Sequence, residues 1–228
     1  QPPAHSLPPT ASRPQPPTHG LTLTQQPRAP VSQWSARGPA PPDARARFGR
    51  RPDGLVVAGG RLYISDKAAH CIAVFTLPEM RYELSFGSRG SGDGELCDPS
   101  GLALLSAKAE IVVADVSNHR LQCFSLVGEY TRQIGRSGRA PGCFHLPTGV
   151  ETVGGDAGGG DAVLVVAERR RVQVLTSEGV PLQVVTPPLC GSLHGVSARA
   201  MRVLVADSEQ RRLHEFQLQP RNLRNALL

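Results

Sequence analysis

Short apolar runs separated by turn-forming residues dominate the chain after about residue 50. In one clear stretch the runs cover residues 102–105, 110–114, 121–126 and 129–134, and Gly, Pro, Asp and Asn stand between them. Runs of this length that are rich in Val, Ile and Leu predict β-strands. No part of this region shows an apolar stripe with the period of a helix. We therefore expect an all-β fold with almost no helix.

The strand pattern repeats along the chain. The segments GSRGSGDGELCDPSG (87–101) and GRSGRAPGCFHLPTG (135–149) align at an offset of 48 residues, with their glycines and prolines in register. The run IVVADVSNHRLQCF (111–124) has counterparts at 62–75, 163–175 and 203–216, whose acidic residues are separated by 49, 53 and 39 residues. Four short antiparallel strands in a unit of roughly 40–50 residues predict a propeller blade. The sequence thus predicts four blades.

The repeated acidic residues and glycines have structural explanations. A carboxylate at the end of an apolar strand commonly accepts backbone N–H bonds from the turn that follows. Glycines accept the positive φ values of a sharp connector, and Glu95 and Leu96 stand where a phosphate-binding loop needs Lys and Ser or Thr. Leu96 and Phe144 are predicted apolar plugs between blades. We assign structural roles to Asp66, Asp115, Glu168, Asp207, Arg120, Gly87, Gly94, Pro99, Gly101, Gly135, Gly142, Pro147 and Gly149.

The second copy resembles a known motif. The NHL-repeat family carries D-x-x-N-x-R-[ILV]-x-x-[FY], and Asp115, Asn118, Arg120, Leu121 and Phe124 match each fixed position. The resemblance covers about residues 48–218, although Cys71 stands at the arginine position of the first copy. It implies a β-propeller of the NHL type, as found in tripartite-motif NHL proteins, that serves mainly as a docking platform. No cofactor is expected.

Composition separates an N-terminal part from the repeats. Residues 1–52 hold 13 of the 21 prolines and few apolar side chains, so this part cannot bury enough surface to offset its ordering entropy. We predict a disordered Pro-rich linker over 1–47, an NHL-repeat β-propeller over 48–218 and a tail over 219–228. The blades are expected at about 48–86, 87–134, 135–185 and 186–218.

The fourth copy offers no clear outer strand, and the chain starts with glutamine rather than methionine. Either the chain near Phe48 supplies the missing outer strand and closes a four-bladed ring, or the propeller is an open arc completed by a partner or by a further segment. We favour the open arc, and we expect the chain to be a piece of a longer protein. The unpaired edges of such a propeller would invite self-association.

The net charge of +6 arises in the linker. Residues 1–52 contain seven arginines and one aspartate, whereas residues 53–228 hold 18 basic and 18 acidic residues. In the repeats, the turn after the second strand and the connector between blades emerge on the same face, because consecutive antiparallel strands alternate in direction. This face gathers basic residues. We predict a partner site formed by Lys67, His70, Arg89, Asn118, His119, Arg136, Arg139, Arg169, Arg170, Arg171 and Arg211.

These features predict a non-enzymatic module that docks a protein partner. The resemblance implies the substrate-recruiting part of a ubiquitin-ligase-like protein, although this chain holds no RING, B-box or coiled-coil sequence. The alternative, also implied by the resemblance, is single-stranded RNA binding on the basic face. The third is a metal-dependent lyase or lactonase with His145 and His194 as ligands. Two histidines without a third ligand make a poor metal site, so we predict no catalytic or metal-binding residue.

The cysteines indicate a location. The five cysteines never form a C-x-x-C pair and fall in different repeats, which is typical of reduced thiols in a cytoplasmic protein. No apolar run approaches the ~20 residues that a membrane span needs. We therefore expect no membrane partner.

Overall fold

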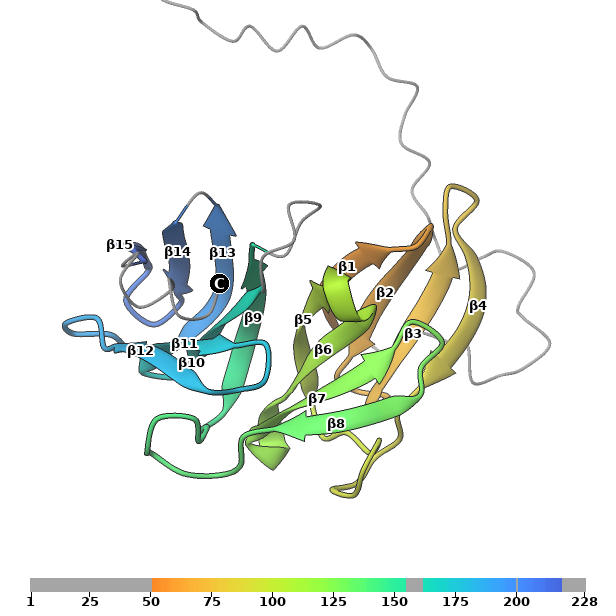
Figure 1. Ribbon diagram of the computed structural model, residues 1–228, viewed down its shortest axis with the longest axis horizontal. Coiled ribbons are helices and arrows are strands. Elements are labelled where there is room, and N and C mark those ends of the chain that lie inside the picture. Colours follow the sequence, from red (N-terminus) through yellow and green to blue (C-terminus); the bar gives the residue numbers. More distant parts are fainter. Residues whose placement is uncertain (1–50, 155–161, 200, 219–228) are drawn as a thin grey trace, which may run out of the picture. The chain divides into compact units, whose positions relative to one another are not determined.

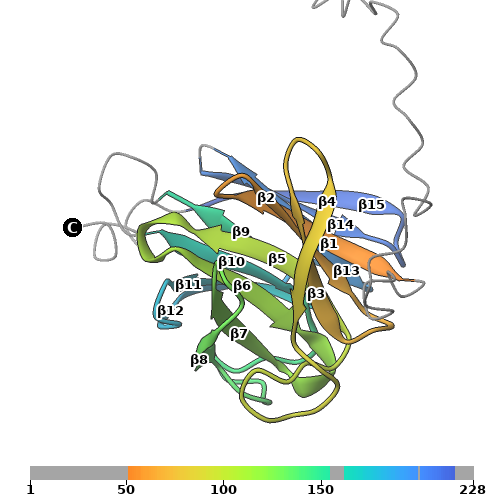
Figure 2. The ribbon, with the colours of Figure 1, turned by 90° about the vertical axis from the view of Figure 1, so that its right-hand side faces the viewer.

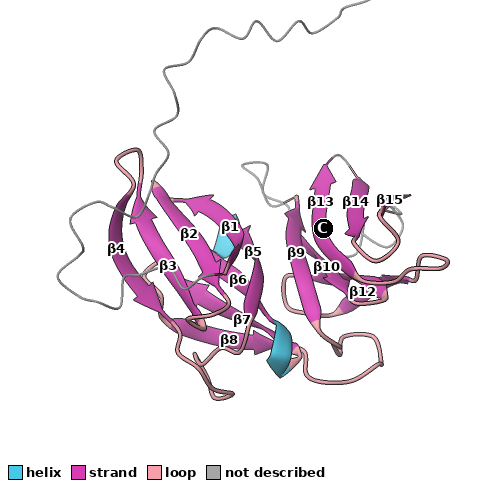
Figure 3. Ribbon diagram, turned by 180° about the vertical axis from the view of Figure 1, so that it is seen from behind, coloured by secondary structure: helices cyan, strands magenta, loops and turns pink. Residues whose placement is uncertain are grey.

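Strands make up almost all of the regular structure (Figures 1 and 3). This computed structural model describes residues 51–154, 162–199 and 201–218. The predicted disordered linker over 1–47 and the tail over 219–228 lie outside the described residues. Within the described residues the only helical elements are the short 3₁₀ turns η2 (Ser106–Lys108) and η3 (Val116–Asn118). The expectation of almost no helix is confirmed, and no helix of the described part could cross a bilayer.

The strands form four antiparallel sheets in which neighbours in sequence are neighbours in space. Blade 1 contains β1 (Pro52–Ala58), β2 (Arg61–Asp66), β3 (Cys71–Thr76) and β4 (Arg81–Phe86). Blade 2 contains β5 (Pro99–Leu105), β6 (Glu110–Asp115), β7 (Arg120–Ser125) and β8 (Tyr130–Ile134). Blade 3 contains β9 (Pro147–Val153), β10 (Val163–Glu168), β11 (Arg171–Thr176) and β12 (Pro181–Val185). Blade 4 contains β13 (Leu193–Arg199), β14 (Arg202–Asp207) and β15 (Arg212–Gln217).

This arrangement is the predicted four-bladed β-propeller. The inner strands lie next to one another, β1 against β5, β5 against β9, and β9 against β13 (Figure 2). The last blade has three strands within the described residues, as its sequence suggested.

The two middle blades are apolar on both sides. Every residue of β6 and of β10 is buried, although successive side chains of a strand point to opposite faces. A sheet covered on both faces needs apolar residues at nearly every position, and this explains the continuous runs IVVA and VLVVA. In contrast, β1 and β13 alternate between more exposed and more buried residues, because within the described residues one face of each end blade has no neighbouring blade.

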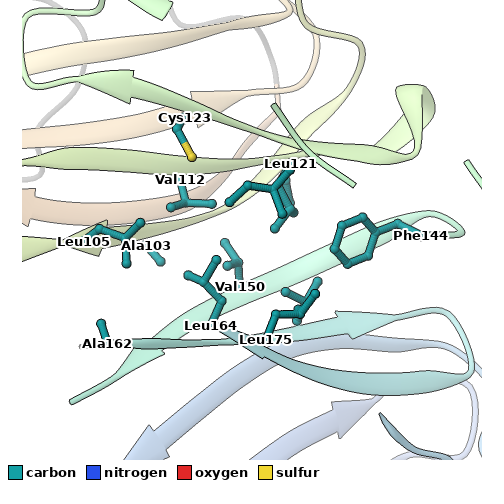
Figure 4. Close-up of a cluster of buried hydrophobic side chains, with 13 residues drawn as sticks. Ala103, Leu105, Val112, Leu121, Cys123, Phe144, Val150, Ala162, Leu164 and Leu175 are labelled. Atoms are coloured by element: carbon teal, nitrogen blue, oxygen red, sulfur yellow. The ribbon is translucent and has the colours of Figure 1, made fainter. Parts of the chain in front are cut away.

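The cores lie between the blades. Figure 4 shows one of them, in which Val112, Leu121 and Cys123 of blade 2 face Val150, Leu164 and Leu175 of blade 3. Phe144, from the connector between these blades, is fully buried in the same cluster. Leu96 takes the corresponding place between blades 1 and 2. Both connectors thus insert one large apolar side chain between two sheets.

The connector glycines occupy conformations that other residues rarely adopt. Gly87 and Gly94 have φ of +84° and +77°, and Gly135 and Gly142 have +71° and +79°. The connector therefore needs glycine at its beginning and before its apolar plug. Pro99 and Pro147 then open the inner strands β5 and β9.

A buried network joins each middle blade to the connector before it. Asp115 has no exposed surface, and its Oδ1 accepts the Cys97 N–H at 2.7 Å. Its Oδ2 accepts from Arg120 Nε at 2.8 Å, and Arg120 Nη2 donates to the carbonyl oxygens of Gly92 and Glu95. Blade 3 repeats this arrangement, with Glu168 accepting from the His145 N–H at 2.7 Å and from Arg171 Nε at 2.8 Å.

The strand-end carboxylates therefore do more than the predicted turn capping. Asp66 does accept N–H bonds from Ala68 and Ala69 in the turn that follows it. Asp207 accepts from Gln210 in its own turn and also from Gly191 and Ser192 in the connector before it. Asp115 and Glu168 hold the preceding connector. The sequence pattern located the carboxylates but did not indicate this partner.

We predict that Asp115→Ala destabilises the propeller by about 3–5 kcal/mol, because it leaves the buried Arg120 without a counter-charge. The free energy of unfolding in urea measures this loss. Asp115→Asn keeps an acceptor for the Cys97 N–H and should cost less. The matched control is Glu83→Ala, which breaks the more exposed Arg61–Glu83 pair and should leave the unfolding midpoint close to that of the wild type. Equal effects of the two alanine variants would contradict the role given to Asp115.

Candidate functional site

The loops at one end of the blades form a polar face, which we call the connector face. It comprises the connectors 87–98, 135–146 and 186–192 and the turns 67–70, 116–119, 169–170 and 208–211. Backbone bonds tie turns to connectors: Ser117 N donates to Cys97 O at 3.1 Å, and Ser208 N donates to Ser192 O at 3.0 Å. All eleven predicted partner-binding residues lie on or beside these loops. They are Lys67, His70, Arg89, Asn118, His119, Arg136, Arg139, Arg169, Arg170, Arg171 and Arg211.

Asn118, Arg171 and Lys67 use their side-chain nitrogens for contacts within the fold. Asn118 Nδ2 donates to Gly90 O at 2.8 Å and to Asp115 at 2.9 Å. Arg171 pairs with Glu168 and also donates to the carbonyl oxygens of Arg139 and Cys143, so it repeats the role of Arg120. Lys67 Nζ lies 2.5 Å from Asp53 Oδ2. Their hydrogen-bonding groups serve the propeller itself.

Two histidines at equivalent positions support the connectors. His70 Nδ1 accepts the Asp98 N–H at 3.1 Å, and His119 Nδ1 accepts the Leu146 N–H at 3.0 Å. Both histidines have positive φ, at 54° and 56°. The His119 ring also stacks on the exposed His145 ring, with centroids 5.3 Å apart and planes within 6°. This stack places a flat, partly exposed aromatic surface on the connector face.

The connector face contains a groove of about 550 Å³ between the second connector and the turn of blade 3. Glu168 and Arg171 are paired at the groove. Arg139, Arg169 and Arg170 are exposed, and within the described residues none of their guanidinium groups forms an ion pair. The groove is lined by Arg139, His145, Glu168, Arg169, Arg170, Arg171 and Thr186. A groove with three uncompensated guanidinium groups can bind carboxylates or phosphates.

A second hollow, of about 230 Å³, lies where the four inner strands meet. At its wall Asp53 Oδ2 accepts from Ser100 Oγ at 2.5 Å and pairs with Lys67. Burial raises the pKa of Asp53, but the hydrogen bonds from Lys67 and Ser100 outweigh it and hold the pKa below its usual value. Burial raises the pKa of Glu151, on the same wall. The two carboxylates of this hollow are thus one that is compensated by Lys67 and Ser100 and one that is partly buried.

The arrangement does not favour an enzyme. His145 lines the groove and His194 lines the inner hollow, so the two candidate metal ligands do not converge on one ion. Within residues 51–154, 162–199 and 201–218 no group of three or more His, Cys, Asp or Glu side chains could hold a metal. Burial raises the pKa of the Cys71 thiol to about 11 and that of Cys123 to about 12. These thiols stay protonated and are poor nucleophiles.

Some residues of the connector face escaped the sequence pattern. Gln122 and Gln173 each bind a connector glycine, since Gly94 N and Gly142 N donate to their side-chain oxygens at 3.0 Å. Alignment of the third strands of the repeats could have found this shared glutamine. Thr186 lines the groove from the third connector, and His145 stacks on His119 of another blade. Neither placement carries a signal in a single sequence, because each depends on how distant segments meet.

Comparison with known proteins agrees with the fold. The family model of the NHL repeat matches residues 96–124. The chain is 30% identical over 152 residues to Protein brain tumor of Drosophila melanogaster, covering 60% of this chain and 14% of that protein. It is 47% identical over 47 residues to Protein lin-41 of Caenorhabditis elegans, covering 21% and 4%. It is 38% identical over 79 residues to E3 ubiquitin-protein ligase TRIM71 of Rattus norvegicus, covering 35% and 8%. The chain therefore spans a small part of these relatives.

Solved structures share the fold at low identity. One chain of a nidogen/laminin complex superimposes with a TM-score of 0.55 at 18% identity, covering 73% of this chain and 60% of that chain. Virginiamycin B lyase from Staphylococcus aureus gives 0.53 at 15% identity, covering 75% and 57%. At these identities the likeness concerns the fold alone. The chain thus carries an NHL repeat at 96–124, is similar in sequence to these three relatives, and has the fold of a four-bladed β-propeller.

Proposed function

We propose that this propeller is a non-enzymatic module that docks a protein partner in the groove of the connector face. The observation that carries the proposal is the set of exposed arginines Arg139, Arg169 and Arg170, which lack ion pairs within the described residues. The groove lies between the second connector and the turn of blade 3, and the Glu168–Arg171 pair forms part of its wall. An extended peptide segment with several Asp or Glu side chains has the complementary charge.

The remaining basic residues of the predicted site extend this surface. Arg89 and Arg136 lie on the connectors beside blades 2 and 3, and Arg211 lies on the turn of blade 4. Their positions would allow a partner larger than a peptide to contact several blades. We assign them to the margin of the docking surface, where charges chiefly raise the association rate.

One relative suggests a cellular role. TRIM71 of Rattus norvegicus is named as an E3 ubiquitin-protein ligase, and its match to this chain covers 8% of it. We propose that this propeller recruits substrates in a ligase-like protein. The five cysteines are free thiols, as in proteins of a reducing compartment, which supports a cytoplasmic location.

The double variant Arg169→Ala/Arg170→Ala should weaken the binding of acidic peptides roughly tenfold or more, since a hydrogen bond to a charged group contributes about 1.5–3 kcal/mol. Fluorescence anisotropy with a set of labelled Asp- and Glu-rich peptides measures the dissociation constants. The same peptides with Asn and Gln in place of the acids test the need for charge.

The matched control is Arg81→Ala/Arg199→Ala, which removes two exposed arginines from the opposite ends of the blades. It should leave peptide binding unchanged. The docking proposal fails if both double variants weaken binding equally, or if neither does.

Single-stranded RNA is a second candidate ligand for the same face, and the stacked rings of His119 and His145 favour it. A nucleobase can stack on an exposed aromatic ring while neighbouring arginines contact the phosphates. His145 lines the groove that holds Arg169 and Arg170, so both contacts are available to one strand.

If RNA binds there, Arg169→Ala/Arg170→Ala should reduce the slope of log K against log salt by about 1.4, because each phosphate contact contributes about 0.7. His145→Ala should instead lower the affinity roughly tenfold without changing the slope, since it removes stacking and no fixed charge. Filter binding of a labelled single-stranded RNA pool between 50 and roughly 200 mM salt measures both. An RNA affinity that is unchanged by Arg169→Ala, Arg170→Ala and His145→Ala would exclude this face as the RNA site.

A further inference from the structure

The two end blades each present an apolar face to solvent. On blade 1, Leu55 and Val57 are 66% and 53% exposed. Their cross-strand partners Ile64 and Leu62 lie on the same face and are partly exposed. We call this the blade 1 outer face. Several clustered aliphatic residues at such exposure are more than the scattered apolar residues normal for a protein surface.

Blade 4 presents a second apolar face at the other end of the series. Leu204 is 42% exposed and Leu213 is 68% exposed, and the partly buried Ala206 pairs directly with Leu213. We call this the blade 4 outer face. Val203 and Val205 of the same strand point the opposite way and are fully buried against blade 3.

In blade 2 the face equivalent to the blade 4 outer face is covered by the next blade. Counted from the strand-end aspartate, Val112, Ala114 and Leu121 are its equivalents of Leu204, Ala206 and Leu213. All three are fully buried against blade 3. The blade 4 outer face thus has the side chains that contact a following blade.

The blade 1 outer face has the side chains that contact a preceding blade. In register with Leu55, Leu62 and Ile64 are Leu102, Ile111 and Val113 of blade 2. These three are buried in the core shared with blade 1. The outer faces are therefore the two halves of one blade-to-blade contact.

The glycines of the inner strands also show where blade 4 has space for a following blade. A Cβ added to Gly101 would lie 2.7 Å from Val150 N of the next blade, and one added to Gly54 or Gly149 would collide with Ser100 O or His194 O. A Cβ added to Gly195 meets nothing within 4 Å. Glycine stands at this position in all four blades. In blades 1, 2 and 3 the inner strand of the next blade packs against this glycine, whereas within the described residues no following strand packs against Gly195.

Charge at the hairpin end is also complementary. Between blades 2 and 3, Lys108 beside the first hairpin of blade 2 pairs with Glu178 in the last turn of blade 3. In blade 4 the corresponding hairpin carries Arg202, which is exposed and pairs with Glu215 of the same blade. In blade 1 the corresponding last turn carries the exposed Glu79. A blade 4 placed against a blade 1 would bring Arg202 toward Glu79.

We propose that two copies of this chain associate head to tail, with the blade 4 outer face of one copy packed on the blade 1 outer face of the other. The contact repeats the blade-to-blade packing already present three times in each chain. When both pairs of faces meet, two copies close into a ring of blades in which no outer face remains in water.

The first test uses the full chain in sedimentation velocity between about 1 and 100 micromolar, a range that reveals ordinary dimer affinities. The wild type should associate, and Leu204→Asp/Leu213→Asp should raise the dissociation constant roughly a hundredfold or more. Leu55→Asp should act in the same direction. Val127→Asp, which changes an exposed valine in the β7–β8 turn, is the control and should associate like the wild type.

Because Leu55, Leu204 and Leu213 are already exposed, these substitutions should not unfold the chain, and circular dichroism melting checks this. A wild type that stays monomeric at 100 micromolar, roughly the upper end of the range, overturns the proposal. So does association that persists in Leu204→Asp/Leu213→Asp. A monomer whose Leu55 and Leu213 are protected from hydroxyl-radical labelling would place another segment of the same chain on these faces, and this too overturns it.

The second test reverses charges. Arg202→Glu and Glu79→Arg should each weaken association several-fold, and the double variant should recover affinity by restoring an opposite-charge pair. The proposed contact between blade 4 and blade 1 would be contradicted if the double variant associates no more tightly than the single variant that associates more weakly.

Discussion

A buried strand-end carboxylate, paired with an arginine and bonded to the connector backbone, is the interaction on which the arrangement of the blades depends. The connector crosses from one sheet to the next without a strand partner, so its N–H and C=O groups must find other partners when it is covered. Asp115 and Arg120 supply an acceptor for the Cys97 N–H and donors for two carbonyl oxygens. Neither side chain could be buried alone, because each would carry an unpaired charge. Pairing makes their burial tolerable and fixes the connector at the same time.

This interaction also decides which charges remain for a partner. Arg171 lies beside two arginines in the sequence, but its position relative to Glu168 commits it to the connector. Arg169 and Arg170 belong to the turn and stay exposed in the groove. A connector contact also fixes the orientation of His119. Its Nδ1 accepts the Leu146 N–H, and its ring face is left to stack on His145. The candidate site is therefore formed by the side-chain groups that are not used in contacts between blades and connectors.

The other constraint is that a blade has two apolar faces. In blades 2 and 3 both faces are covered, and β6 and β10 are buried along their whole length. The same residue types occur at the two ends of the series, where Leu55, Leu204 and Leu213 meet solvent. The repeat thus specifies blade-to-blade contact at every blade, whether or not a neighbour is available in the same chain.

The sequence by itself determined the all-β class, the number of blades and, within the described residues, the three strands of the fourth blade. Strand length and turn residues are local properties of the sequence, and the spacing of Asp66, Asp115, Glu168 and Asp207 shows the repeat. It also placed the basic residues on one face, because alternating strand direction follows from the strand order. Only the tertiary structure decided which of them are free. Arg169 and Arg171 look alike in the sequence, yet one lies exposed on a turn and the other donates to Cys143 O across a connector. The stack of His119 on His145 and the open space beside Gly195 likewise depend on contacts between blades, which no local pattern encodes.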